Sequence, residues 1–279
     1  MTDRSDARGG YAARRARLLA RIAGLDGLAV AFSGGVDSSV LLHAAHAVLG
    51  ERAVGVVADS PSLPRRELAD AVRVAEHIGA RLEVVRTAEG EDARYRANRG
   101  DRCYFCKAAL FDVMDRFVRA NRLGAMAFGE ITDDLLDDRP GARAAREYGV
   151  VAPLAEAGFG KADVRRYARE AGLPVADKPS SACLASRIPV GTEVTPQRLA
   201  RVEAAEDALA QLGLAVLRVR DHGELARLEV GPEELAYAAE HTAEIGVALA
   251  AAGFARFELG IYRSPADRAG GAATAVSGG

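Results

Sequence analysis

The chain has 279 residues, a length that suggests one large and one small domain. Hydrophobic residues make up 49% of it, which is ample for a core, and the formal net charge of −2 argues against nucleic acid or anionic membrane as a partner. The sequence contains no run of about 18 apolar residues that would cross a membrane. Its amino-terminal stretch lacks the apolar core of a secretory signal, so we expect a cytoplasmic protein.

Residues 11–23 are predicted to form an amphipathic surface helix, because apolar and charged residues alternate along it. An apolar run at 28–32 predicts a buried strand, and a glycine-rich turn follows it before a helix that ends at Gly50. Strands then continue to alternate with helices, which predicts a parallel sheet with right-handed crossovers. The further strands are expected at 53–59, 81–87 and 125–129, and the helices at 64–79 and 106–121.

A helix at 161–171 precedes an irregular stretch, 173–195, that contains three prolines and Cys183. A structureless segment of that length in a compact protein is usually functional or disordered. The pattern that follows predicts a small α+β domain, with helices at 196–212 and 233–251 and strands at 214–220, 225–230 and 254–259. We therefore expect domains at 1–182 and 183–263, and a disordered tail at 264–279.

The stretch after the first predicted strand reads S-G-G-V-D-S-S at 33–39, and we call it the phosphate loop. A strand, a glycine-rich turn and a helix N-terminus form an anion site, because free N–H groups and the positive end of the helix dipole converge there. It is not a Walker loop, since it contains no lysine. The Asp37 carboxylate would repel phosphate, so its presence in this loop indicates that it helps to hold Mg²⁺. The residues expected to bind the nucleotide are Ser33, Gly34, Gly35, Asp37, Ser38 and Ser39.

Ligands of parallel sheets lie beyond the carboxyl ends of the strands. One crevice is therefore expected to combine the phosphate loop with Asp59 and Ser60 after the second strand and with the segment from Gly129 to Asp134 after the fourth. Four aspartates at 133–138 are compatible with Mg²⁺ binding. Composition alone favours an acidic loop that caps the next helix, 142–148.

Three cysteines are an odd and low number, which agrees with a reducing compartment. Cys103 and Cys106 form a C-x-x-C motif at a helix start, and Cys183 lies in the irregular stretch beside Arg187. A thioredoxin-like motif would follow the first strand of its fold, and structural zinc needs four ligands. Three thiolates would leave one iron of a [4Fe–4S] cluster open for an exogenous ligand. The alternative that all three are small buried hydrophobes stays open.

Several segments together resemble the LarE family, ATP-dependent sulfur transferases of the PP-loop superfamily that help to make the nickel-pincer nucleotide cofactor. The resemblance covers roughly residues 11 to 262 and is most specific around Cys183. It rests on A-F-S-G-G-V-D-S-S (31–39), A-D-S-P-S-L-P-R-R-E-L (58–68), R-C-Y-F-C-K (102–107), D-D-L-L-D-D-R-P-G (133–141), K-P-S-S-A-C-L-A-S-R-I-P-V-G-T-E-V-T (178–195) and L-R-V-R-D-H-G-E-L-A-R-L-E-V (217–230). It implies an α/β, parallel-sheet ATP pyrophosphatase domain, similar to the adenine nucleotide alpha hydrolases, followed by a smaller α+β domain.

The family implies that ATP adenylates a carboxylate of pyridinium-3,5-biscarboxylic acid mononucleotide and that a sulfur nucleophile then displaces AMP, which leaves a thiocarboxylate. In one branch the residue matching Cys183 gives up its own sulfur and acts once. In another, three cysteines hold a [4Fe–4S] cluster that carries a transferable sulfide, and this chain resembles that branch through Cys103, Cys106 and Cys183. The resemblance implies ATP, Mg²⁺ and the cluster as cofactors, an external sulfide source and a small nucleotide substrate as partners, and a homo-oligomer.

Arg187 is expected to lower the pKa of Cys183 or to bind a substrate carboxylate. Arg218 and Arg220 alternate on one strand face and are expected to hold the nucleotide phosphate. For all three arginines, a surface ion pair is the alternative. Where the family usually reads G-T-N, this chain has Gly129, Glu130 and Ile131, which implies altered contacts near the adenylate.

Three other functions stay open from the sequence. A tRNA thiolase of the same superfamily would show a broad basic surface. An ammonia-dependent adenylating ligase, like NAD or GMP synthetase, would need none of the three cysteines. A non-enzymatic nucleotide-binding module would need neither Asp37 nor a long reactive loop.

Overall fold

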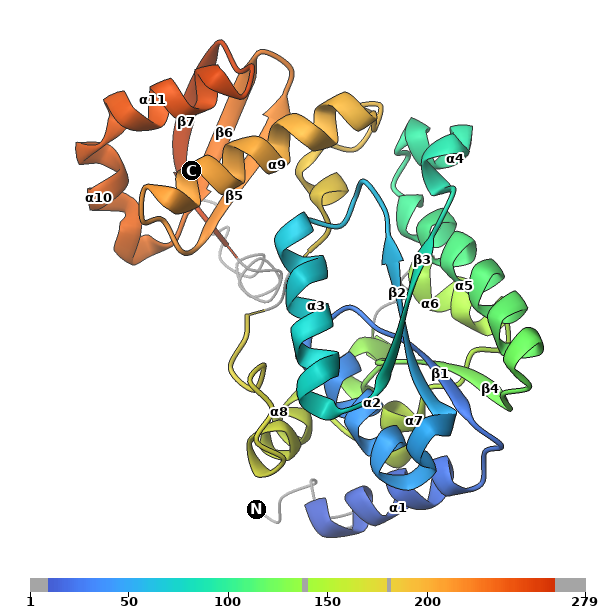
Figure 1. Ribbon diagram of the computed structural model, residues 1–279. Coiled ribbons are helices and arrows are strands. Elements are labelled where there is room, and N and C mark those ends of the chain that lie inside the picture. Colours follow the sequence, from blue (N-terminus) through green and yellow to red (C-terminus); the bar gives the residue numbers. More distant parts are fainter. Residues whose placement is uncertain (1–9, 137–139, 180–181, 264–279) are drawn as a thin grey trace, which may run out of the picture. The chain divides into compact units, whose positions relative to one another are not determined.

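The computed structural model of the chain describes residues 10–136, 140–179 and 182–263 (Figure 1). Contacts within the chain divide it into two compact units, Met1–Cys183 and Leu184–Gly279, which we call unit 1 and unit 2. The tail predicted to be disordered, 264–279, lies outside the described residues. None of the helices in the described part is both long enough and apolar enough to cross a membrane.

Unit 1 alternates helices with the strands of one parallel sheet (Figure 1). Its helices are α1 (Tyr11–Ala23), α2 (Val36–Leu49), α3 (Arg65–Ile78), α4 (Ala93–Ala97), α5 (Arg102–Asn121), α6 (Pro140–Glu147), α7 (Pro153–Ala157) and α8 (Lys161–Glu170). The sheet has the order β3-β2-β1-β4 and is formed by β1 (Leu28–Ala31), β2 (Ala53–Asp59), β3 (Arg81–Arg86) and β4 (Ala125–Phe128). The α/β parallel-sheet architecture predicted from the sequence is confirmed.

Helices cover both faces of this sheet, and β1 is therefore buried at every position. Leu28 and Val30 belong to an apolar core with residues of α1, α2 and α8, whereas Ala29 and Ala31 belong to a second core with residues of α5 and α6. A strand that is buried on both faces reads as an unbroken apolar run rather than an alternating one. The chain places β2 and β3 on one side of β1 and β4 on the other. The carboxyl ends of β1 and β4 therefore flank the switch point where ligands of such sheets bind.

Unit 2 is a small α+β unit, as the sequence predicts. Its helices are α9 (Pro196–Gln211), α10 (Leu235–Glu240) and α11 (Thr242–Ala251), and its strands are β5 (Leu217–His222), β6 (Leu225–Val230) and β7 (Arg256–Ile261). β6 pairs antiparallel with β5 and parallel with β7. Several bounds differ from the prediction. The strand predicted at 214–220 is Leu217–His222, and the strand predicted at 254–259 is Arg256–Ile261. The single helix predicted at 233–251 is broken at His241.

His43 on α2 contacts α8, since its Nδ1 atom lies 3.1 Å from the hydroxyl oxygen of Tyr167. Burial lowers the pKa of His43, and the charges of His46, Arg15 and His77 lower it further. In the pH range between the folded pKa and the ordinary value of about 6.5, the unfolded chain binds a proton that the folded chain does not. The stability that depends on neutral His43 is therefore present above about pH 6.5 and is lost as the pH falls through the folded pKa.

We expect His43→Gln to lose less stability on acidification than the unaltered chain, because the substituted side chain does not titrate. The free energy of unfolding is to be measured by urea titration at about pH 7.5 and about pH 5.5. His222→Gln changes an exposed histidine and serves as the control, which should follow the unaltered chain. Equal losses in all three proteins would contradict the assignment of this acid sensitivity to His43.

Candidate functional site

The phosphate loop joins β1 to α2 and is held in shape by its own hydroxyl groups. The Ser38 hydroxyl donates to the Gly35 carbonyl at 3.1 Å and accepts from the Ser33 N–H at 3.2 Å. The Ser33 hydroxyl accepts from the Gly35 N–H at 3.4 Å. The buried Ser39 hydroxyl has no hydrogen-bond partner within the described residues. Since no side chain from those residues caps α2, the N–H groups of its first turn remain available for an anion.

Two glycines allow other segments of unit 1 to approach this loop closely. Gly34 has a φ of +67°, and a Cβ atom there would lie 2.9 Å from the Cα atom of Ala71 on α3. A Cβ atom at Gly129, directly after β4, would lie 2.9 Å from the backbone nitrogen of Ser38. Larger residues at either position would therefore displace backbone. The loops that follow β1 and β4 thus meet at the switch point of the sheet.

Asp59 and Ser60 at the end of β2 are held by Arg65, the first residue of α3. The Arg65 guanidinium pairs with the Asp59 carboxylate and donates to the Ser60 carbonyl at 2.8 Å. Ser60 is buried, and its hydroxyl accepts from the Ser62 N–H at 3.2 Å. Because β1 and β2 are parallel neighbours, this segment lies at the same edge of the sheet as the phosphate loop.

The segment after β4 carries the departure from the family pattern. Ile131 is 3% exposed and belongs to the apolar core of unit 1, and its N–H donates to the Asp134 carboxylate at 3.2 Å. A side chain packed in this core is not available to a nucleotide. The Asp133 carboxylate accepts from the N–H of Lys161 at 2.6 Å, so it caps α8 rather than the next helix in the chain. Of the four predicted aspartates, those at 137 and 138 lie outside the described residues.

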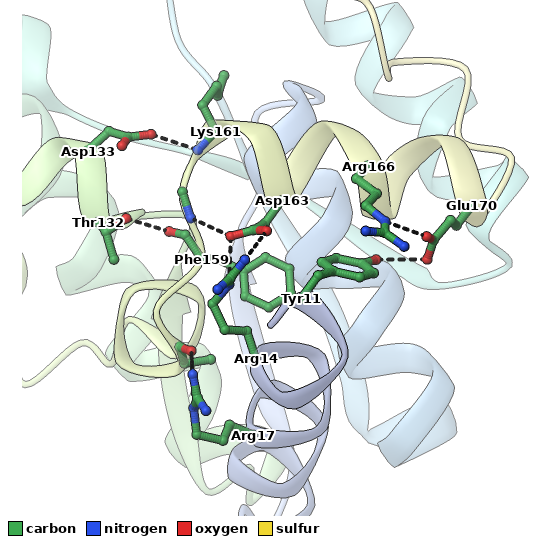
Figure 2. A network of polar contacts seen from close by, with 12 residues as sticks. Tyr11, Arg14, Arg17, Thr132, Asp133, Phe159, Lys161, Asp163, Arg166 and Glu170 are labelled. Atoms are coloured by element: carbon green, nitrogen blue, oxygen red, sulfur yellow. Dashed lines mark hydrogen bonds and ion pairs between the residues drawn. The ribbon is translucent and has the colours of Figure 1, made fainter. Parts of the chain in front are cut away.

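Lys161, which the sequence analysis did not single out, contacts the phosphate loop. It is the first residue of α8, and its Nζ atom donates to both carboxylate oxygens of Asp37, at 2.9 and 2.7 Å. Figure 2 shows its neighbours at the start of α8, with Asp133 at its backbone nitrogen. The two partners are 124 positions apart, so no local pattern indicates the pair. Asp37, the predicted Mg²⁺ ligand, thus has an ammonium group beside it.

The three cysteines belong to unit 1, and none of them forms a disulfide. Cys103 and Cys106 lie in the first turn of α5, which begins at Arg102 and not at Cys106 as predicted. Burial, followed by the negative charges of Cys183 and Glu89, raises the pKa of the Cys106 thiol to about 12. Cys103 contributes in the same direction. Cys103 and Cys183 therefore both lie within electrostatic range of Cys106.

Glu89 is another residue that the sequence analysis missed. It is 3% exposed, and its Oε2 atom has no hydrogen-bond partner in the part of the chain that the structure describes. Burial raises the pKa of Tyr95 on α4, and Cys106, Cys183 and Glu89 add to that effect. A buried carboxylate oxygen without a hydrogen-bond donor destabilises a fold, so a cation or a donor from a ligand would stabilise the protein here. The acidic sequence E-G-E-D at 89–92 resembles an exposed turn, which conceals this burial.

The donor set around Cys106 fits a thiolate-bound iron–sulfur cluster in its chemistry. Three thiols match a cluster with one open iron, and bound iron would stabilise the thiolate form of Cys106 against the burial that raises its pKa. Within residues 10–136, 140–179 and 182–263, no group of three or more His, Cys, Asp or Glu side chains is close enough to hold a metal ion. The cysteine side chains would therefore have to draw together around such a cluster.

Arg187 lies in unit 2, in a short 3-10 turn, Leu184–Arg187, and is 1% exposed. Its guanidinium donates to the two carboxylate oxygens of Glu206 on α9, at 2.9 and 3.1 Å, and to the Ser186 hydroxyl at 3.0 Å. Glu206 also accepts from the backbone N–H of Val219 at 3.0 Å. Arg187 is thus a fixed, buried cation rather than a mobile surface arginine.

Arg218 and Arg220 lie on the same face of β5, since both are partly exposed while their neighbours in the strand are buried. Arg220 donates to the Glu229 carboxylate at 2.8 and 3.1 Å. The Arg218 guanidinium lies 5.0 Å from the ring centroid of Tyr262. Burial, and then the charge of Arg187, lower the pKa of Arg218. A bound anion would relieve the repulsion between the guanidinium groups of Arg187 and Arg218.

The chain is similar to known proteins over most of its length. It is 44% identical over 211 residues to an uncharacterized protein of Synechocystis sp., and the match covers 76% of this chain and 79% of the relative. It is 36% identical over 220 residues to the pyridinium-3,5-bisthiocarboxylic acid mononucleotide synthase of Lactiplantibacillus plantarum, which covers 78% of this chain and 80% of that one. An uncharacterized protein of Methanocaldococcus jannaschii is 28% identical over 203 residues, with 72% of this chain and 76% of the relative covered. No protein-family model matches the chain.

Proposed function

The chain belongs to the LarE family, and from that premise we propose that it is an ATP-dependent sulfur transferase. Its substrate would be pyridinium-3,5-biscarboxylic acid mononucleotide, and it would convert a carboxylate of that molecule into a thiocarboxylate. The observation that carries the proposal is the 36% identity, over 78% of this chain, to a synthase named for the bisthiocarboxylic product.

The proposed reaction has two steps. A substrate carboxylate oxygen forms a bond to the α-phosphorus of ATP, the bond to pyrophosphate breaks, and an acyl adenylate results. A sulfur nucleophile then forms a bond to the acyl carbon, and AMP leaves with the electron pair of the broken C–O bond. Because AMP is a good leaving group and the nucleophile is an anion, no strong general base is needed.

The phosphate loop would serve the first step. The N–H groups at the start of α2 and the loop hydroxyls would stabilise the charge that develops on the phosphates. Asp37 would hold Mg²⁺, which neutralises the same charge. The absence of side chains at Gly34 and Gly129 keeps the backbone of neighbouring segments against the loop, so its N–H groups hold their positions.

The thiols would serve the second step. Cys103, Cys106 and Cys183 are the residues that would hold a [4Fe–4S] cluster, which, when bound, supplies an open iron for a transferable sulfide. The electrostatic influence of Cys103 and Cys183 on Cys106 supports this assignment. Arg187 would bind a substrate carboxylate only by exchanging its Glu206 partner for it, and Arg218 and Arg220 would bind the nucleotide phosphate. We also expect a homo-oligomer, which light scattering would reveal.

The test uses the full chain, reconstituted with iron and sulfide without oxygen and then supplied with MgATP, sulfide and the dicarboxylate substrate. We expect AMP, pyrophosphate and a product in which sulfur replaces oxygen, all measured by liquid chromatography and mass spectrometry. The Asp37→Asn variant should form all three products much more slowly than the unaltered chain. Product in excess of enzyme, with iron that disappears in each Cys→Ala variant, supports the cluster.

Other outcomes assign other functions. One product per chain and dehydroalanine at residue 183 would instead make Cys183 a single-use donor. An amide formed with ammonia, and no thiocarboxylate with any sulfide source, would contradict the sulfur-transferase proposal and favour the ligase. Binding of ATP without any AMP formation would leave a nucleotide-binding module.

A further inference from the structure

The phosphate loop contains no lysine, yet the fold places one beside it. Lys161 Nζ lies 2.9 and 2.7 Å from the two carboxylate oxygens of Asp37. We propose that Lys161 is the pyrophosphate-binding lysine of this site: it holds Asp37 while the site is empty and moves to the β- and γ-phosphates when MgATP enters. This inference rests on the proposed function, since it assigns a further catalytic residue to the same nucleotide site.

The backbone of Lys161 is held firmly on both sides (Figure 2). Its own N–H donates to the Asp133 carboxylate at 2.6 Å, and the preceding Gly160 N–H donates to Asp163 at 3.2 Å. Asp163 is in turn fixed by Arg14 of α1, which donates to its two oxygens at 2.9 and 2.8 Å. These contacts fix the origin of the lysine side chain relative to the phosphate loop, and they make Asp133 a positioning residue.

The ammonium group at the far end of the Lys161 side chain can exchange Asp37 for another anion. The side chains of Lys161 and Asp37 are 39% and 29% exposed, and an ion pair this accessible to water contributes little to stability. Four flexible methylene groups let the ammonium swing to a nearby anion while its Cα atom stays in place. The polyphosphate of ATP carries more negative charge than one carboxylate, so it competes effectively for the ammonium.

The exchange also ensures that the negative charge of Asp37 is compensated in both states of the site. A carboxylate in a phosphate loop repels the ligand unless a cation compensates it. In the empty site Lys161 compensates Asp37, and in the loaded site Mg²⁺ would take that place. Lys161 is then left to stabilise the negative charge that builds up on the departing pyrophosphate. No proton transfer is involved, because the ammonium acts as a charge and a hydrogen-bond donor.

The test compares binding of pyrophosphate with binding of AMP by calorimetry on the full chain. We expect Lys161→Met to weaken binding of magnesium pyrophosphate by about tenfold or more and to leave binding of AMP within about twofold. Lys161→Arg, which keeps the charge, should fall between. Arg166→Gln removes an exposed ion pair with Glu170 on the same helix and is the matched control, expected to bind like the unaltered chain.

A second measurement keeps the inference testable if Lys161→Met folds poorly. In the presence of EDTA, Asp37→Asn should bind pyrophosphate more tightly than the unaltered chain, because it removes the competing carboxylate. Lys161→Gln in the Asp37→Asn background should abolish that gain. A gain that persists there, or equal weakening of AMP and pyrophosphate in Lys161→Met, would overturn the inference and leave Lys161 a structural partner of Asp37. Neither assay needs sulfur transfer, so failure of the proposed function would appear separately, as binding without thiocarboxylate.

Discussion

Cys183→Ala is expected to lower the rate of thiocarboxylate formation by about a thousandfold, which corresponds to about 4 kcal/mol of activation free energy. The substitution removes a thiol that the structure brings within electrostatic range of Cys106. Without it the second step loses either a cluster ligand or the sulfur itself. The first step depends on the phosphate loop and on Asp37, which the substitution does not touch. Exchange of labelled pyrophosphate into ATP, in the presence of the dicarboxylate substrate, should therefore continue within about threefold of the unaltered rate.

Comparison with the other cysteines makes this prediction specific. If the three thiols act together, Cys103→Ala and Cys106→Ala should lose sulfur transfer to a similar degree, because effects within one functional unit are not additive. If Cys183 alone donates sulfur, both variants should retain a single turnover. Ala182→Ser, next to Cys183, serves as a control for disturbance of this segment. Loss of pyrophosphate exchange in Cys183→Ala would contradict the separation of the two steps.

The phosphate loop and the parallel sheet could be predicted because their signals are local. An apolar run followed by two glycines and a helical pattern is contained within 28–50, and each of its features has a short-range cause. The structure adds the tertiary reason for two of the glycines. Gly34 lies against Ala71 and Gly129 against Ser38, and both contacts join segments far apart in the chain.

Residues whose roles depend on distant partners could not be predicted. Lys161 stands at a helix start like many surface lysines, and only the fold brings its ammonium to Asp37. Distant partners also explain why the strand predicted to end at residue 220 continues through Asp221 to His222. Asp221 is 0% exposed within β5, because Arg198 and Arg201 of α9 pair with it. These tertiary ion pairs allow a charged residue to be buried in the strand.

Glu206→Ala is expected to destabilise unit 2 by about 3–5 kcal/mol, the typical effect of breaking a buried ion pair. Both partners of the Glu206–Arg187 pair are 1% exposed, so the Arg187 guanidinium would remain buried without its carboxylate. The backbone N–H of Val219 would lose its acceptor as well. The substitution would also increase the repulsion between Arg187 and Arg218, because Glu206 offsets part of it.

The free energy of unfolding is to be followed by hydrogen exchange of peptides from α9 and β5 during urea titration, so that unit 2 is observed by itself. Gln211→Ala, an exposed position at the end of α9, should change stability by less than about 0.5 kcal/mol. The double variant Arg187→Met with Glu206→Leu replaces both charges by apolar groups, and it should recover most of the lost stability, because the desolvation of two ions no longer opposes folding. A loss in Glu206→Ala below about 1 kcal/mol would mean that water reaches Arg187 in solution, and Arg187 would then be an adaptable ligand for a substrate carboxylate rather than a fixed one.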